Sequence, residues 1–152
     1  MSQQKKLSRF EAEESLTVEI ILPSKYSDHC EIAASVKFLS INNLHLNRLE
    51  YDGDAEQVLI KDSSGSLELT AKTDYEITVD KIAGRLDINQ WKAKAILHIP
   101  EKNMVNVSNK GRKCNVYYVK EGNPAEWETV SDSENEISIS GIFSELVVDL
   151  IS

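Results

Sequence analysis

The chain has 152 residues, of which 25 are acidic and 17 basic, and its formal net charge is −8. This length predicts one domain, and the negative charge argues against nucleic acid or an anionic membrane as partner, because both are themselves negative. The sequence contains no run of about 18 apolar residues, the length needed to cross a bilayer, so we expect no membrane insertion.

We expect the opening segment 1–15 to lead into the fold without being part of it. It carries two lysines with no apolar run behind them, which does not predict a secretory signal. The strongest helical pattern of the chain, over residues 9–14, has no apolar stripe to bury. The expected location is the compartment of synthesis for the chain as written, or the cell envelope if an export segment has been trimmed.

From Leu16 onward, short runs of alternating apolar residues predict strands, separated by turn pairs such as Asp52-Gly53 and Ser64-Gly65. The pattern is typical of an all-β protein. After the first run, at 16–20, the predicted strands are SVKFLSI, EQVLIKD, SLELTA, YEITVD, RLDIN, AILHI, MVNVS, NVYYV, EISIS and ELVVDL.

Segments 48–65, 66–84 and 85–103 repeat one pattern at steps of 18 and then 19 residues. A constant step of this length predicts a parallel β-solenoid (a β-helix or β-roll), in which each coil buries its apolar face against the next. We expect stacked strands over 16–121, an N-terminal strand capping one end, and the acidic segment 122–152 covering an end or a side. The expected core columns are Leu49, Leu67, Leu86; Tyr51, Leu69, Ile88; and Leu59, Ile77, Ile96.

The next column, with Lys61, Val79 and His98, is less regular. In the run AILHI the inward set is either Ile96 with His98, or Ala95 with Leu97 and Ile99. A strand that is apolar on both faces is usually covered on both. We therefore expect a C-terminal segment to pack over it.

The repeat resembles a bacterial adhesin-domain family, a β-solenoid domain of unknown molecular function. The matching stretches are LTVEIILPSKYS (16–27), the steps DSSGSLELTA and KIAGRLDIN, and ILHIPEKNMVNVSNKG (96–111). The resemblance covers about residues 16–111 and implies a binding module at the bacterial envelope. It implies no catalytic residues. The Ser-Gly-Asp steps typical of the family are replaced here by Ser-Gly-Ser and Ala-Gly-Arg.

The outward columns supply the candidate binding face. Glu50, Glu68 and Asp87 are expected to stack about one strand spacing apart, and like charges placed so close repel one another. Solvent, neighbouring arginines or a divalent cation such as Ca²⁺ would offset the repulsion. Exposed aromatic side chains would supply anchors. The further residues of the expected face are Asp52, Trp91 and Trp127. For each tryptophan, a buried structural role is the alternative.

Other candidate sites have plainer explanations. The segment YDGDAE (51–56) has the spaced acids of a calcium loop but also the Asp-Gly pair of an ordinary turn. The histidines, His29, His45 and His98, share no metal-ligand spacing. Cys30 and Cys114 predict two buried free thiols, with a disulfide as the alternative.

The basic, tyrosine-containing segment 102–120 has the composition of a nucleic-acid site, but the acidic segment that follows can lie beside it and neutralise it. No catalytic motif is present. The sequence therefore predicts a non-enzymatic module that binds protein or glycan through its strand ladder, with no catalytic, cofactor or metal residues. The alternatives are a cytoplasmic regulatory protein on the same fold and, more remotely, a β-helix polysaccharide lyase.

Overall fold

The computed structural model describes residues 19–23, 25–26, 28–103, 105–127 and 133–152. Every regular element in these ranges is a strand, which confirms the all-β prediction. None of the described segments is a helix long and apolar enough to span a membrane. The weak helical pattern over 9–14 and most of the first predicted strand lie outside the described residues, and residues 19–23 are not in a strand.

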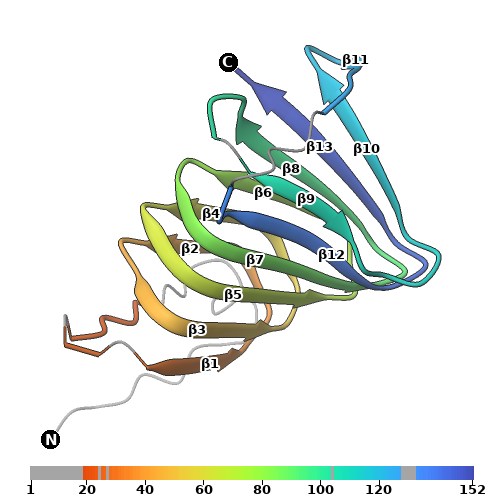
Figure 1. Ribbon diagram of the computed structural model, residues 1–152. Helices are drawn as coiled ribbons and strands as arrows, with labels where there is room; N and C mark the ends of the chain where they lie inside the picture. The colour runs from red at the N-terminus through yellow and green to blue at the C-terminus, as the bar shows by residue number, and fades with distance from the viewer. Residues whose placement is uncertain (1–18, 24, 27, 104, 128–132) are drawn as a thin grey trace, which may run out of the picture.

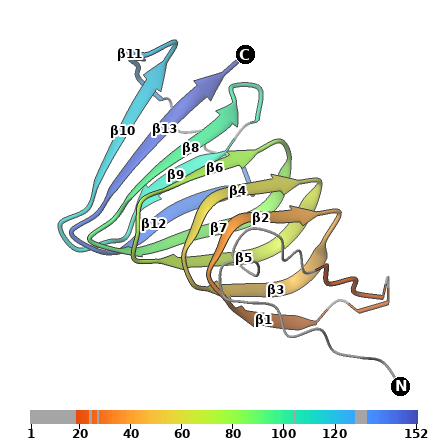
Figure 2. The same cartoon turned by 180° about the vertical axis from the view of Figure 1, so that it is seen from behind.

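The strands form two sheets, and the chain passes back and forth between them (Figures 1 and 2). Neighbouring strands are parallel throughout, except for the antiparallel pair β10 and β11. Sheet A has the order β1 (His29–Ala33), β3 (His45–Asp52), β5 (Ser63–Ala71), β7 (Ile82–Trp91), β12 (Glu136–Ile142), β9 (Asn106–Asn109). Sheet B has the order β11 (Asn123–Pro124), β10 (Asn115–Lys120), β13 (Glu145–Ile151), β8 (Lys94–Pro100), β6 (Tyr75–Val79), β4 (Ala55–Lys61), β2 (Val36–Asn42).

The C-terminal strands occupy interior positions in both sheets. In sheet A, β12 lies between β7 and β9, and in sheet B, β13 lies between β8 and β10. The last two strands of the chain thus separate strands that precede them in the sequence. The expectation that residues 122–152 cover an end or a side is therefore corrected: residues 136–151 pair edge to edge within the sheets. Pairing on both edges satisfies the backbone groups that an open slot would expose.

The register of sheet A follows the sequence prediction. Leu49, Leu67 and Leu86 are aligned across β3, β5 and β7, and Tyr51, Leu69 and Ile88 form the next inward column. Each of these six side chains is at most 3% exposed. Parallel strands of constant register place the same position of each repeat on the same face, which is why the 18- and 19-residue steps were informative here.

The predicted register of sheet B is wrong by one residue. Ile77 is fully buried, but its partners are Val58 and Leu97, whereas Leu59 and Ile96 point to the outer face. The cause is that the separation between the two strands of each unit grows along the chain: Val58 follows Tyr51 by seven positions, and the equivalent separation is eight and then nine positions in the next two units. The inward set of β8 is accordingly Ala95, Leu97 and Ile99, and the predicted column of Lys61, Val79 and His98 does not form.

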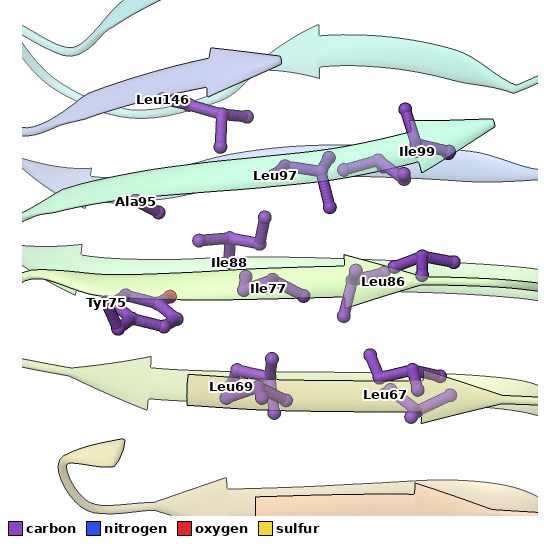
Figure 3. Packing of buried hydrophobic residues seen from close by; sticks show 14 of the residues in the cluster. Leu67, Leu69, Tyr75, Ile77, Leu86, Ile88, Ala95, Leu97, Ile99 and Leu146 are labelled. Atoms are coloured by element: carbon purple, nitrogen blue, oxygen red, sulfur yellow. The ribbon is translucent and has the colours of Figure 1, made fainter. Parts of the chain in front are cut away.

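The inner faces of the two sheets pack on each other to form the core. Figure 3 shows Ile77 of sheet B next to Ile88 of sheet A, with Leu97 and Leu146 above them and Leu67 and Leu69 below. Burial of such side chains contributes about 1.5–3 kcal/mol each. Trp127 extends this core: its ring stacks on Tyr118 at a centroid distance of 6.4 Å, and its indole N–H donates to the carbonyl of Val105.

The two cysteines are unpaired, as predicted, but they differ in exposure: Cys114 is buried, whereas Cys30 is half-buried on the edge strand β1. We expect a thiol reagent to modify Cys30 first and Cys114 only slowly, because the reagent must reach the sulfur. Labelling of the native protein followed by mass spectrometry of its peptides measures both rates, with a Cys30→Ser variant isolating Cys114. Labelling of Cys114 as fast as Cys30 would contradict its burial.

Candidate functional site

The predicted acidic column lies on the outer face of sheet A. Glu50, Glu68 and Asp87 are aligned across β3, β5 and β7, and Glu31 of β1 extends the column by one place. The repeat did not predict Glu31, because β1 precedes the first clear repeat unit. Adjacent parallel strands lie about 4.8 Å apart, so the carboxylates form a close row.

Neighbouring side chains offset the charge of this row. Arg48 lies between two of its members, with Nε 2.6 Å from Glu50 and a terminal nitrogen 3.2 Å from Glu68. His29 lies 3.2 Å from Glu50, and Asp87 accepts a hydrogen bond of 2.9 Å from the Ser140 hydroxyl. These contacts agree with the prediction that neighbouring arginines offset the repulsion between the stacked carboxylates. Within the described ranges, no three His, Cys, Asp or Glu side chains are grouped so that they could hold a metal ion.

A second polar column runs parallel to the acidic row. Asp52, Thr70 and Asn89 are aligned across the same three strands, with Ser140 of β12 next in line. The middle of the outer face is therefore lined by polar side chains across β3, β5 and β7, and Ser140 continues the second column into β12. Such a surface offers many hydrogen-bonding groups and little apolar area.

A shallow groove of about 610 Å³ follows the start of β3, β5 and β7 and joins the same face. Its floor is backbone at Gly65 and Gly84, which are paired across β5 and β7. A Cβ on Gly84 would lie 2.5 Å from the carbonyl oxygen of Gly65, and its φ of +117° disfavours any other residue. The remaining lining includes His45, Asn47, Ser64, Ser66, Arg85, Glu134 and Glu136.

Glu136 carries the strongest electrostatic contacts of this groove. Lys110 lies 2.6 Å and Arg85 3.1 Å from its carboxylate, and the Ser108 hydroxyl donates a hydrogen bond of 2.8 Å. The hydrogen bond from Lys110, followed by that from Ser108, holds the pKa of Glu136 below its usual range. This contact joins Lys110 of the basic segment 102–120 to Glu136 of the acidic segment that follows, so the expected neutralisation is seen at this one position.

The structure separates the two tryptophans of the predicted face. Trp91 ends β7 with 55% of its surface exposed, in a position to act as an anchor. Trp127 is partly buried and packs against the core, which favours its structural alternative. The sequence carried no signal to distinguish them, since both lie in polar surroundings.

The histidines lie apart from one another. His45 is hydrogen-bonded to Ser64 at 2.7 Å in the groove, and His29 lies beside the acidic row. His98 is on the outer face of sheet B, where its ring is 2.8 Å from Asp149 and 3.8 Å from Glu76. Neither of the two grooves described for this structure is lined by His98.

The acidic turn 51–56 has an ordinary structural role. The carboxylate of Asp54 accepts hydrogen bonds from the backbone N–H groups of Lys72 and Thr73 in the next turn, at 2.8 and 3.1 Å. One oxygen of Asp54 is thereby committed to holding consecutive turns together, as the turn interpretation predicts.

Comparison with known proteins gives no further guide: no family model, curated protein or solved structure matches the chain. The site must therefore be interpreted from its geometry.

Proposed function

We propose that the chain is a non-enzymatic binding module, adhesin-like in its mode of action, and that its strand pairs are the coils of a parallel β-solenoid. Six pairs support the solenoid: β1–β2, β3–β4, β5–β6, β7–β8, β12–β13 and β9–β10 follow one another through both sheets. Coils that stack in register present the same outward position again and again.

The observation that carries the binding function is the outer face of sheet A. Its aligned polar columns and its groove adjoin one another across β3, β5 and β7, and the groove is shallow and lined mainly by polar and charged residues. Sites for small molecules are concave and mostly apolar. An extended ligand, either a protein segment or a glycan chain, fits this surface better, since it can contact successive strands at a constant spacing.

The chemistry of the face also favours binding over catalysis. A general acid or base works best with a pKa near the operating pH. The pKa of Glu136, the most strongly paired acid of the groove, is shifted downward, away from neutrality. Its contacts with Arg85 and Lys110 hold it as a charged, oriented acceptor.

The face can be blocked without touching the core. Ser66 points outward in the groove, beside Arg85 of the next strand, so Ser66→Trp would fill the groove. We expect this variant to lose binding to isolated bacterial envelope or to glycans on an array, with its melting temperature unchanged. Thr78→Trp is the matched control, because Thr78 points outward on sheet B.

Two outcomes would contradict the proposal. One is equal binding by the Ser66→Trp variant, the Thr78→Trp variant and the unmodified chain, which would exclude the outer face of sheet A. The other is hydrolysis or elimination of any array glycan, measured as release of reducing or unsaturated ends, which would make the chain an enzyme.

A further inference from the structure

A cluster of exposed aromatic and basic side chains lies along one edge of the molecule, where three turns lie side by side. These turns join β7 to β8, β12 to β13 and β9 to β10, and they converge at one edge in both views (Figures 1 and 2). Trp91 is aligned with Ile142, which is bridged to Arg112. The next residues, Lys92, Phe143 and Lys113, occupy equivalent places in their turns. We call these six residues the aromatic–basic corner.

The side chains of the corner are mostly exposed, and within the described ranges its basic residues are not in ion pairs even though Asp74 and Glu145 lie nearby. Trp91 is 55% and Phe143 52% exposed. Lys113 places its Nζ 4.8 Å from the Phe143 ring centroid, a cation–π contact. Among the described residues, Lys92, Arg112 and Lys113 form no ion pair. A concentration of positive charge on a chain of net charge −8 is a local field that attracts an anionic partner.

The backbone shows that stability alone does not account for Phe143. Its φ is 54°, in the left-handed region, and those of Lys92 and Lys113 are 52° and 56°. Asn and Asp tolerate this conformation best, whereas a bulky side chain there is strained. Asn43 and Asp62 hold the positive-φ positions in the turns from β2 to β3 and from β4 to β5, which run from sheet B to sheet A. Phe143 combines backbone strain with an exposed ring, which a contact with a partner would explain.

A groove of about 360 Å³ beside the corner indicates the kind of partner. It is lined by three lysines (Lys92, Lys94 and Lys113), two acids (Asp74 and Glu145), Phe143, and the polar residues Asn115 and Ser144. Lys94 lies 3.6 Å from Glu145, which leaves Lys92 and Lys113 as the lysines of the groove that a partner can bind. A bilayer is flat and could not enter this groove, and the chain's net charge would repel an anionic one. One face of the Phe143 ring already contacts Lys113, which disfavours a stacked sugar. A peptide segment can place carboxylates on the lysines and an apolar side chain on the rings.

We propose that the aromatic–basic corner docks an acidic protein segment that carries apolar side chains between its carboxylates. Trp91 and Phe143 supply the apolar contacts, and Lys92, Arg112 and Lys113 bind the carboxylates. Trp91 lies at the end of the outer face of sheet A, so the corner extends the proposed binding face. The partner class inferred for the corner therefore applies to that end of the face. The inference rests on the proposed function in that respect.

The probe is a fluorescent peptide of repeated Glu-Asp-Leu units, with repeated Gln-Asn-Leu and Glu-Asp-Ser units as controls that remove the charge and the apolar side chain respectively. Fluorescence anisotropy with the full chain should show binding of the first peptide only. Lys92→Glu combined with Lys113→Glu should weaken it by about tenfold, because exposed charge pairs contribute modestly and two are reversed. Equal binding of all three peptides, or an unchanged affinity of the double variant, would overturn the proposal.

Phe143→Asn separates binding from folding. We expect this variant to lose affinity for the acidic peptide while its melting temperature stays the same or rises, because Asn relieves the left-handed strain. Phe38→Asn is the control, since Phe38 of β2 is similarly exposed at 56% but lies elsewhere, and it should leave peptide binding unchanged. A lower melting temperature for Phe143→Asn, or equal losses of affinity in both variants, would contradict the inference.

Further arms separate this inference from the proposed function and from other partners. Ser66→Trp blocks the groove of sheet A and should leave peptide binding at the corner intact. If the peptide does not bind but envelope or glycan binding persists, the corner proposal fails and the proposed function stands. Binding of phosphatidylserine vesicles or of a uronate polymer in preference to the peptide would show that the partner class is wrong.

Discussion

A chain that ends at Asn135, and so lacks β12 and β13, is expected not to fold. These two strands fill interior places in both sheets, between β7 and β9 and between β8 and β10. Their removal would leave a gap of two strand spacings, about 10 Å, with unpaired backbone groups along both sides. No rearrangement of a neighbouring loop could close such a gap in two sheets at once.

The loss of buried apolar side chains also predicts that the shortened chain does not fold. Ile137, Ile139, Leu146 and Val148 are at most 1% exposed and pack in the core. At about 1.5–3 kcal/mol for each side chain, their removal costs roughly 6–12 kcal/mol, similar to the roughly 5–15 kcal/mol by which a whole domain is stable. Far-UV circular dichroism during heating should show no cooperative transition for the shortened chain.

A shorter deletion is the control. Removing Ile151 and Ser152 takes away only exposed residues at the end of β13, and the melting temperature should change little. A cooperative transition in the chain that ends at Asn135, near that of the full chain, would show that β12 and β13 do not hold the interior places. In the structure, β12 and β13 come last in the sequence but lie between strands that precede them. Folding of the shortened chain would show that the earlier strands do not depend on this insertion.

The sequence predicted the strands better than it predicted their order. The ten runs named from β2 onward correspond to strands in the structure, because each is a short alternating pattern bounded by turn residues. The insertion of β12 and β13 could not be inferred, since EISIS and ELVVDL have the same alternation whether they lie inside a sheet or at its edge. Register within a repeat is local information, whereas the order of strands depends on contacts between distant segments.

The candidate site was predicted unevenly for the same reason. The row of Glu50, Glu68 and Asp87 follows directly from the repeat of sheet A, which keeps its register. The groove over Gly65 and Gly84 could have been found from the Ser-Gly and Ala-Gly steps that end two successive units. The aromatic–basic corner brings Trp91 beside Ile142, 51 positions later in the chain, and no local pattern relates them.

Replacement of Ile77 by Asp is expected to unfold the domain, and it tests the corrected register of sheet B. Ile77 is 0% exposed and lies between Val58 and Leu97, facing Ile88 of sheet A. A carboxylate there would be buried without a partner, and such changes cost about 4 kcal/mol or more, a large part of the total stability. Urea denaturation monitored by circular dichroism should find the variant unfolded or close to its midpoint in buffer.

Leu59→Asp is the matched control, because it introduces the same charge on the neighbouring strand. Leu59 points to the outer face, aligned with Ser40 and Thr78, so its carboxylate would remain in contact with water. We expect a shift of about 1 kcal/mol or less for this variant. The uncorrected register, with Leu59 stacked on Ile77 and Ile96, requires both variants to unfold. Equal destabilisation of the two would therefore restore that register, and a large difference between them supports the one that the structure shows.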